Sequence, residues 1–413
     1  MDEPIHRWFH LKEAYSAQLL PRLFKDAGWC PQDEISLFDP FAGSGTTLVS
    51  AFAISNQDEK PAHLLGIERN PIIQLVASAK LAALAGGSKL ANQVEGLLGS
   101  VATEYNACLR ASRVYETPSV TLNNEKYFDR SYVSSLLALR KAIDRAAEGI
   151  PWLILRTCLA ASVEPAGRLR RDGRALRYTP ERRPVHPKAS FDQFVKVCLS
   201  DMRGCVNPIE GTHAEVRLGD GRMIPSDIGD KKFDWIVFSP PYPNNIDYTE
   251  VYKTEAWALG YYDDTADMRR QRLSTVRSHP SVAFPEEYSY AQSVSRKEVN
   301  QLLAPLLAAV PSDRYTTNRR RIIRGYFDDM FQVLKSCRQV LSGDGRLVFV
   351  VGNSVHGTAD SRFVIAADLI MAALAELTGW KVEEVRVARW TTRRGGKVPF
   401  LRESVVCLAP VTK

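Results

Sequence analysis

Four consecutive residues, Ser239-Pro240-Pro241-Tyr242, have the side chains and backbone to act on an amine. They follow the apolar run 233–238, which predicts a buried strand. The two prolines carry no N–H group, so the backbone here offers carbonyl oxygens as acceptors. The Ser239 hydroxyl and the Pro240 carbonyl can therefore accept hydrogen bonds from both protons of an –NH₂ group. Such contacts would expose the nitrogen lone pair, and Tyr242 could stack on a flat ring beside it.

A second stretch, 38–47 (FDPFAGSGTT), has the composition of a ligand-binding turn between a strand and a helix. Its glycines allow the backbone to approach a ligand, and the helix start supplies N–H groups. A phosphate loop would need a Lys just before the Ser/Thr, which this turn lacks. Asp39 would also repel phosphate. The turn instead favours a cationic or hydroxyl-rich ligand.

The next predicted strand, 63–68 (HLLGIE), also ends in a carboxylate, Glu68. An acidic residue at the end of the second strand of a nucleotide-binding unit typically binds the ribose hydroxyls. Ligands of open α/β sheets bind beyond the carboxyl ends of the strands. We therefore expect Asp39 and Ser239 to face one crevice, with a nucleoside site beside them.

Composition places the chain among ordinary globular proteins. It has 413 residues, a hydrophobic fraction of 45% and a net charge of +7, which gives a modest attraction to polyanions. Its seven cysteines are scattered without a CxxC pair, which favours reduced thiols in the cytoplasm and predicts no structural metal. The amino terminus is polar, and we expect no signal peptide, no membrane-spanning run and no membrane partner.

The order of apolar patterns predicts an α/β core interrupted by two insertions. A helix from residue 72 ends at Gly86-Gly87, after which the α/β alternation stops. Amphipathic helices are expected at 90–111 and 132–147, a third helix that is apolar on most of its faces at 150–163, and a later helix at 363–377. The predicted parts are the first part of the core with the glycine turn (1–87), a helical, Arg-rich insertion (88–205), the core with Ser239 (206–260), a polar insertion (261–318) and the rest of the core sheet (319–413).

Arginines are concentrated at 167–178 (GRLRRDGRALRY). Arg outnumbers Lys here, and its planar guanidinium suits bidentate contact with phosphate. A solvated loop is the common alternative for a charge run, but the interleaved Tyr178 favours contact with a nucleic-acid backbone. The residues predicted to bind DNA are Arg168, Arg170, Arg171, Arg174 and Arg177.

Together, DPFAGSGTT, GIERNP and SPPYPNNIDY resemble the motifs of the S-adenosylmethionine-dependent amino-methyltransferases of DNA. The resemblance extends to YTEVYKTEAWALG, VVGNS and RESVV, but not to residues 88–205. It implies a Rossmann-like class I methyltransferase sheet with a helical, basic insertion. It also implies a cofactor site formed by Asp39, Phe41, Gly43, Gly45, Thr46, Glu68, Asn70 and Asp220, and a catalytic motif formed by Ser239, Pro240, Pro241 and Tyr242.

In that family the Ser form of the catalytic motif is typical of enzymes that methylate N4 of cytosine, whereas Asp or Asn is typical for N6 of adenine. The resemblance implies double-stranded DNA as substrate and admits a cognate restriction nuclease as a partner. Methylation of N6 of adenine and methylation of an RNA amine stay open as alternatives, as does a binding protein that has lost activity. Methylation at carbon 5 would need a nucleophilic Cys after Pro, and the chain has no Pro-Cys dipeptide.

Overall fold

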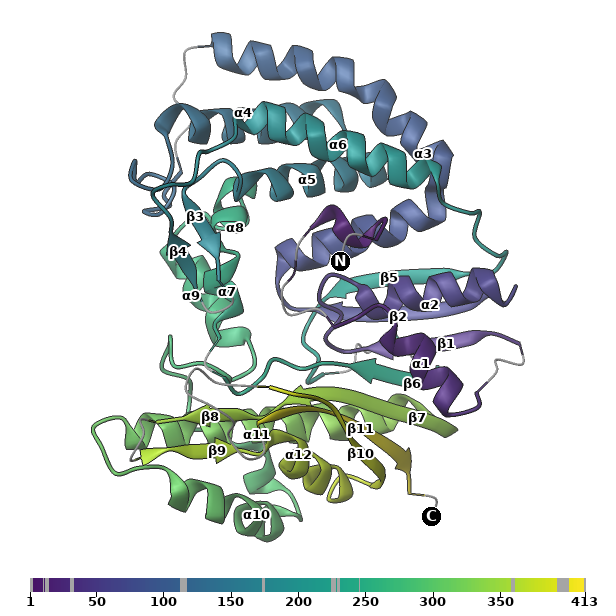
Figure 1. Ribbon diagram of the computed structural model, residues 1–413, viewed down its shortest axis with the longest axis vertical. Coiled ribbons are helices and arrows are strands. Elements are labelled where there is room, and N and C mark those ends of the chain that lie inside the picture. The colour runs from purple at the N-terminus through teal and green to yellow at the C-terminus, as the bar shows by residue number, and fades with distance from the viewer. Residues whose placement is uncertain are drawn as a thin grey trace. The chain divides into compact units, whose positions relative to one another are not determined.

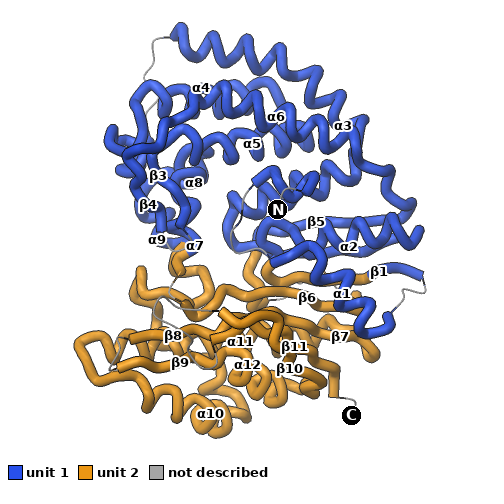
Figure 2. The backbone as a smooth tube through the Cα atoms, viewed as in Figure 1, with its two compact units in different colours: residues 1–35, 42–218, 248–271 blue, residues 36–41, 219–247, 272–413 orange. Residues whose placement is uncertain are grey.

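A computed structural model gives the architecture of the chain. The chain forms two compact units, each built from three segments (Figure 2). Unit 1 comprises residues 1–35, 42–218 and 248–271, and unit 2 comprises 36–41, 219–247 and 272–413. The structure describes residues 3–9, 11, 15–29, 33–111, 117–172, 175–223, 228, 231–244, 246–357, 361–391 and 401–411.

The main sheet has seven strands in the order β10-β11-β7-β6-β1-β2-β5. Strand β11 is antiparallel to both β10 and β7, whereas β1 with β6, β6 with β7, and β2 with β5 are parallel pairs. This mostly parallel sheet, with helices between its strands, confirms the predicted α/β class. The strands are β1 (Ile35–Asp39), β2 (Ala62–Glu68), β5 (His213–Leu218), β6 (Phe233–Phe238), β7 (Leu341–Gly352), β10 (Trp380–Trp390) and β11 (Arg402–Pro410).

Strands β1 and β6 are the hydrophobic centre of unit 2. Every residue of β1 is buried, and so are all but one in β6, as expected for a parallel strand covered on both faces. In the parallel register, Phe38 lies opposite Ile236. Both strands therefore end at the same edge of the sheet, where Asp39 and Ser239 follow.

Unit 1 carries the elements around the glycine turn and a group of helices. Helix α2 begins after Gly45, which has φ +84°, and α3 begins after Asn70. The Asn70 side chain accepts a hydrogen bond from the Ile72 backbone N–H, and Pro71 occupies the first helical position, as is typical of helix starts. The elements are η1 (His6–Trp8), α1 (Leu19–Asp26), α2 (Thr46–Gln57), α3 (Pro71–Arg110), α4 (Arg130–Ala146), α5 (Gly149–Val163), β3 (Leu169–Arg171), β4 (Leu176–Tyr178), α6 (Pro187–Arg203), α7 (Tyr248–Val251) and α8 (Lys253–Leu259), while α9 (Thr265–Ser274) crosses into unit 2.

Helices α3, α4, α5 and α6 pack against one another in unit 1 (Figure 1). Their contact is apolar, with Leu136, Ile143 and Leu155 fully buried. The helices predicted at 132–147 and 150–163 are confirmed as α4 and α5. The predicted helix end at Gly86-Gly87 is instead a kink, because Gly87 has φ +46° and ψ −138° and the helix then resumes to Arg110.

Helix α3 is also long and apolar enough to cross a membrane by length and composition, contrary to the expectation that no run would be. In this protein, 56% of its most apolar window is buried by other parts of the chain. Helix α3 is thus a core helix that packs on α4 and α5 and is kinked at Gly87.

Unit 2 places α11 and α12 beside one another, with α12 against β10, β11 and β7 (Figure 1). The predicted helix at 363–377 is only partly correct, since Phe363–Ile365 forms a strand paired with β8 and the helix begins at Ala367. The β-branched residues Val364 and Ile365 favour this extended start. The remaining elements are η3 (Ser289–Gln292), α10 (Arg296–Ala309), α11 (Thr316–Val340), β8 (Ser354–His356), β9 (Phe363–Ile365) and α12 (Ala367–Glu376).

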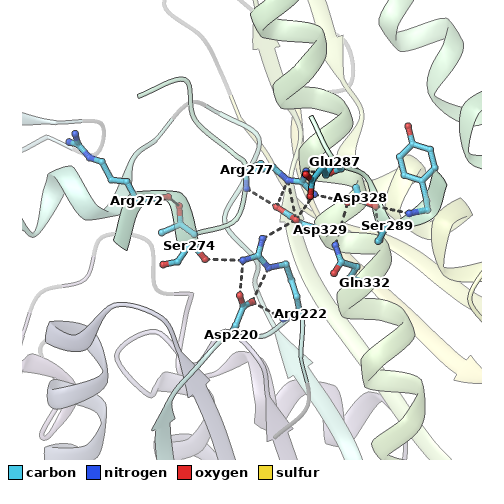
Figure 3. A network of polar contacts seen from close by, with 12 residues as sticks. Asp220, Arg222, Arg272, Ser274, Arg277, Glu287, Ser289, Asp328, Asp329 and Gln332 are labelled. Carbon is cyan, nitrogen blue, oxygen red and sulfur yellow. Dashed lines mark hydrogen bonds and ion pairs between the residues drawn. The ribbon is translucent and has the colours of Figure 1, made fainter. Parts of the chain in front are cut away.

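The polar segment after α9 is fixed to α11 by one buried arginine, Arg277 (Figure 3). Its guanidinium donates to Asp328 Oδ2 at 2.6 Å, to Asp329 Oδ1 at 2.7 Å and to the Glu287 carbonyl at 2.7 Å. The two aspartates are 1% and 0% exposed. Asp328 also accepts from the hydroxyl of Ser289 at 2.7 Å, so its charge is compensated on more than one side. The segment predicted as a polar insertion is therefore anchored by a buried ion-pair network.

Gly66 in β2 should tolerate no side chain. A Cβ there would lie 2.7 Å from both Ala42 Cβ and Leu48 Cδ1, so Gly66→Ala forces these neighbours apart. We expect the free energy of unfolding in urea to fall by about 1–3 kcal/mol. Gly96→Ala is the matched control, because Gly96 lies in α3 with open space around it. It should stabilise the protein by up to about 1 kcal/mol; equal stability of the two variants would contradict the close packing at Gly66.

Arg277→Met tests the buried network. Removing the guanidinium leaves two buried carboxylates without their main partner, so we expect a loss of about 3–5 kcal/mol in the free energy of unfolding. The control is Arg386→Met, which breaks an ion pair with Glu384 whose side chains are 39% and 45% exposed. That change should cost less than about 1 kcal/mol. A loss at Arg277 no larger than at Arg386 would show that the network does not hold the segment.

Candidate functional site

The first part of the site lies in unit 2, at the edge where β1 and β6 end. Asp39 is the last residue of β1 and is 1% exposed, and its Oδ1 accepts from the Phe41 backbone N–H at 2.9 Å. The Phe41 and Phe238 rings lie 5.6 Å apart, so the two strand ends remain in contact beyond the registered pair Phe38–Ile236. The expectation that residues 39 and 239 come from neighbouring strand ends agrees with this geometry.

Ser239 is held by strand β7. Its Oγ lies 3.0 Å from the carbonyl oxygen of Val350 and donates its proton there. A hydroxyl whose proton is used in this way keeps its lone pairs for accepting. Ser239 is partly exposed, so an incoming donor can reach it. The local hydrogen bonding thus gives Ser239 the polarity that contact with an amine requires.

Tyr242 is fixed at both ends of its side chain. Its hydroxyl donates to Glu403 Oε1 at 2.7 Å, and its ring packs on the backbone at Gly352, where a Cβ would lie 2.8 Å from ring carbons. The Tyr242 and Ser239 oxygens are 3.3 Å apart. The ring is partly exposed and its orientation is set by β7 and β11, the strands that carry Gly352 and Glu403.

Asp220 also lies in unit 2, next to the β1 end through its neighbour Gly221. A Cβ at Gly221 would overlap the Pro40 carbonyl, so only glycine permits this approach. The Asp220 carboxylate accepts from Arg222 Nε at 2.9 Å and Nη2 at 2.6 Å, and Arg222 also pairs with Asp329 at 3.0 Å (Figure 3). The predicted cofactor residue Asp220 is thus held by an arginine that the buried network of Asp329 fixes in turn.

The second part of the site, in unit 1, is the glycine turn with the end of β2. Gly43 and Gly45 both have positive φ, of +52° and +84°. Glu68 bridges the turn and the start of α3, because Oε2 accepts from the Gly43 N–H at 3.0 Å and Oε1 from the Asn70 N–H at 2.7 Å. Burial raises the pKa of Glu68, while these backbone hydrogen bonds favour its ionised form. The predicted residues Gly43, Glu68 and Asn70 are thus brought together.

Thr46 begins α2 and is buried, and the next residue, Thr47, shares a hydrogen bond with the Tyr15 hydroxyl. The amino-terminal segment thereby reaches the start of this helix. The first N–H groups of a helix have no partner within it, so this end favours electron-rich ligand atoms. The turn itself contains no basic side chain, and Asp39 and Glu68 are its acidic neighbours in sequence. The acidic residues suit an amine, a hydroxyl or a sulfonium, the free helix N–H groups suit a ligand oxygen, and the absence of a basic side chain from the turn disfavours a phosphate.

In the described ranges, no group of three or more His, Cys, Asp or Glu side chains is arranged to hold a metal ion. The six described cysteines are free.

The predicted DNA-binding arginines divide into two classes. Arg171 is 5% exposed and forms ion pairs with Glu255 and with Glu164, while its guanidinium stacks on the rings of Phe9 and Tyr252. It is buried in the interior of unit 1, so the phosphate contact predicted for it conflicts with its position. The burial of Arg171 was not predicted because its partner Glu255 lies 84 residues away in the sequence.

The other members of the run lie on a two-stranded hairpin, β3–β4, rather than on a loop. Arg170 and Arg177 are opposite each other in its register and are both exposed. Arg168 forms a bidentate pair with Asp129, at 2.9 and 3.2 Å. Arg174 lies outside the described residues. The hairpin thus presents Arg170 and Arg177 side by side to solvent.

Sequence reasoning did not single out Arg222, Glu403 or Gly352, although each positions a predicted residue. Arg222 follows Asp220 by two residues, a spacing that allows the pairing but does not require it. Glu403 and Gly352 lie in RESVV and VVGNS, the two strands of the resemblance whose individual side chains had no role assigned. The one available signal was Gly352 itself, a glycine within a strand, which leaves room for the Tyr242 ring.

Comparison with known proteins agrees with this geometry. No family model matches the chain. It is 25% identical over 423 residues to the Type II methyltransferase M.AvaI of Nostoc sp., an alignment that covers 93% of this chain and 81% of that protein. It is 21% identical to the Type II methyltransferase M.BsoBI of Geobacillus stearothermophilus, over 92% and 79% of the two chains, and 24% identical to M.MvaI of Kocuria varians, over 83% and 76%. The chain is thus similar, at modest identity and over most of its length, to Type II methyltransferases.

Proposed function

We propose that this protein transfers a methyl group from S-adenosylmethionine to the exocyclic amine of a base in double-stranded DNA. The observation that carries the proposal is the parallel pairing of β1 with β6, which brings Asp39 and the Ser239 motif to one edge of the same sheet. Similarity to Type II methyltransferases over most of the chain supports it. The alternative of an inactive binding protein is disfavoured because all four residues of the Ser239 motif are present.

The glycine turn and Glu68 are proposed to hold the cofactor. When bound, S-adenosylmethionine supplies an electrophilic methyl group on a sulfonium centre. The acidic, lysine-free turn matches this cation, and Glu68 has lone pairs left to accept from ribose hydroxyls after it accepts two backbone N–H groups. Phe41, Gly45, Thr46 and Asn70 complete the proposed set on the same turn and helix starts. Asp220, held by Arg222, is proposed to meet the adenine side.

The Ser239 motif is proposed to hold the target amine. The Ser239 hydroxyl donates to Val350 and so accepts from one amine N–H, while the Pro240 carbonyl accepts from the other. Holding both protons in hydrogen bonds would leave the nitrogen lone pair free to attack an electrophilic methyl group. The methylated amine would then release one proton to solvent, so no strong base is required. Pro241 fixes the turn, and Tyr242 offers a ring face to the base.

Cytosine N4 is the proposed target atom, because position 239 is Ser rather than Asp or Asn. A base within a duplex cannot reach acceptors at a strand end, so the target base has to leave the helix. Chromosomal DNA as substrate would place the enzyme in the cytoplasm. Of the predicted phosphate contacts, Arg170 and Arg177 are retained, because both are exposed and adjacent on the β3–β4 hairpin.

The proposal is tested by the identity of the methylated nucleoside. The purified protein is incubated with labelled S-adenosylmethionine and either DNA or RNA, and the products are digested and separated by mass spectrometry. We expect label in DNA as N4-methylcytosine. N6-methyladenine would correct the base, label in RNA alone would correct the substrate, and label in neither would refute the function.

Ser239→Ala should lower methyl transfer by about 10- to 100-fold, because one hydrogen bond to the amine is lost in the transition state. Binding of S-adenosylmethionine, followed by calorimetry, should stay within about twofold of wild type. Ser342→Ala is the matched control, since its hydroxyl also bonds within unit 2, to Asp234 at 3.0 Å, away from the motif in sequence. Full activity of Ser239→Ala would exclude the assigned role.

Glu68→Gln should weaken S-adenosylmethionine binding by about 10- to 100-fold, since hydrogen bonds to a charged acceptor contribute about 1.5–3 kcal/mol. The amide keeps the shape but offers one acceptor oxygen in place of two. Glu95→Gln, an exposed position of α3 paired with Arg203, is the control and should leave the affinity unchanged. Unchanged affinity in both variants would remove Glu68 from the cofactor site.

A further inference from the structure

One buried arginine of the helical part of unit 1 lacks the partners that the other buried arginines have. Arg156, in α5, is 8% exposed, and its Nε and Nη1 atoms are buried without a hydrogen-bond partner. The carboxylate of Asp144 lies 3.5 Å from Nε, at a geometry that compensates charge without a hydrogen bond. A guanidinium has five donors, and buried donors are nearly always satisfied. Arg156 therefore retains capacity to bind an acceptor.

Arg156 lines a polar cavity of about 360 Å³ between α4, α5 and the end of α8. These three helices lie against one another in unit 1 (Figure 1). The cavity, here called the Arg140–Arg156 pocket, is lined by both arginines, by Asp144 and Asp263, and by the aromatic residues Trp257 and Tyr262, among others. It belongs to neither part of the site described above.

The two arginines are held in place by their surroundings. The Arg156 guanidinium carbon lies 4.9 Å from the centre of the Trp152 ring, and the Trp152 indole donates to Asp144 Oδ1 at 2.8 Å. Arg140 packs against Gly260, which ends α8 with φ +75°. A Cβ at 260 would lie 2.5 Å from Arg140 Nη1, so the glycine leaves room for that guanidinium.

Two arginines and two aspartates line the pocket, and the buried groups there that lack a hydrogen-bond partner are donors of Arg156. Burial lowers the pKa of Arg156, and the nearby positive charge of Arg140 lowers it further, whereas Asp144 and Tyr261 raise it. The Asp144 carboxylate is shared between Arg156 and Trp152, so it does not satisfy the buried N–H groups. A tetrahedral oxyanion would offer the paired acceptors that a guanidinium fork matches.

We propose that the Arg140–Arg156 pocket binds a phosphodiester group of the DNA substrate. The proposal rests on the proposed function, because DNA is the phosphate-bearing molecule that function requires. Bound phosphate oxygens supply acceptors to the guanidinium groups of Arg156 and Arg140, which both line the pocket. The pocket thus adds to the exposed pair Arg170 and Arg177 a backbone contact formed by the α4, α5 and α8 helices.

The test measures how DNA affinity depends on salt. Binding of a fluorescent duplex to the full-length protein is followed by anisotropy between about 50 and 200 mM salt, where each lost phosphate contact makes the log–log slope shallower by about 0.9. Arg156→Gln and Arg140→Gln should each weaken binding several-fold and reduce the slope by about this amount. Arg145→Gln, on the same helix as Arg140 and paired with Glu104, is the control and should keep the wild-type slope.

Thermal melting establishes whether each variant is folded. If Arg156→Gln unfolds, Arg140→Gln is the deciding variant, because Arg140 is only half-buried. Slopes equal to wild type in a folded Arg140→Gln, or the same decrease in Arg145→Gln, would overturn the proposal. Inorganic phosphate is tested separately: if it raises the melting temperature through Arg156 while DNA slopes do not change, the pocket binds a free anion and the DNA contact is wrong. Methyl transfer to DNA by the wild type, measured in parallel, separates failure of the pocket from failure of the proposed function.

Discussion

Parallel pairing of two buried strands is the constraint on which the candidate site depends. Strands β1 and β6 are 198 residues apart in sequence at their registered pairs Leu37–Trp235 and Phe38–Ile236, yet they bury their apolar side chains side by side. In a parallel pair, both chains leave the sheet at the same edge. The polar residues that follow each strand are therefore brought together by the hydrophobic effect acting on the residues before them.

At that edge, hydrogen bonds to the rest of the sheet determine which groups donate and which accept. Val350 takes the proton of Ser239, and Glu403 takes the proton of Tyr242. Both partners come from β7 and β11, strands with no reacting group of their own in the proposed mechanism. Strands β7 and β11 thus orient the side chains that follow β6, and a hydroxyl oriented in this way is an acceptor before any substrate arrives.

The strand–turn–helix unit at 35–57 and the apolar strands could be predicted because their signals are local: an apolar run, two glycines and a helical periodicity. Whether each of two neighbouring arginines is exposed or buried could not be predicted. Arg170 and Arg171 are identical in type, but strand alternation exposes one and buries the other against Glu255. Likewise, Arg222, which pairs with Asp220, is also held by Asp329, more than a hundred residues later. Such outcomes follow from tertiary partners, which a single sequence does not reveal.

Two buried arginines, Arg277 and Arg156, differ in how many hydrogen-bond acceptors surround them. Arg277 donates to two carboxylates and a carbonyl, so its charge is compensated and its position is fixed; a further acceptor would have to displace one of these. Arg156 is buried to a similar degree, but two of its nitrogen atoms, Nε and Nη1, have no hydrogen-bond acceptor. Burying a charge without full compensation costs free energy that the fold has to supply from elsewhere. A satisfied arginine therefore stabilises one conformation, whereas an unsatisfied one beside a polar cavity can gain stabilisation from an acceptor that enters the cavity.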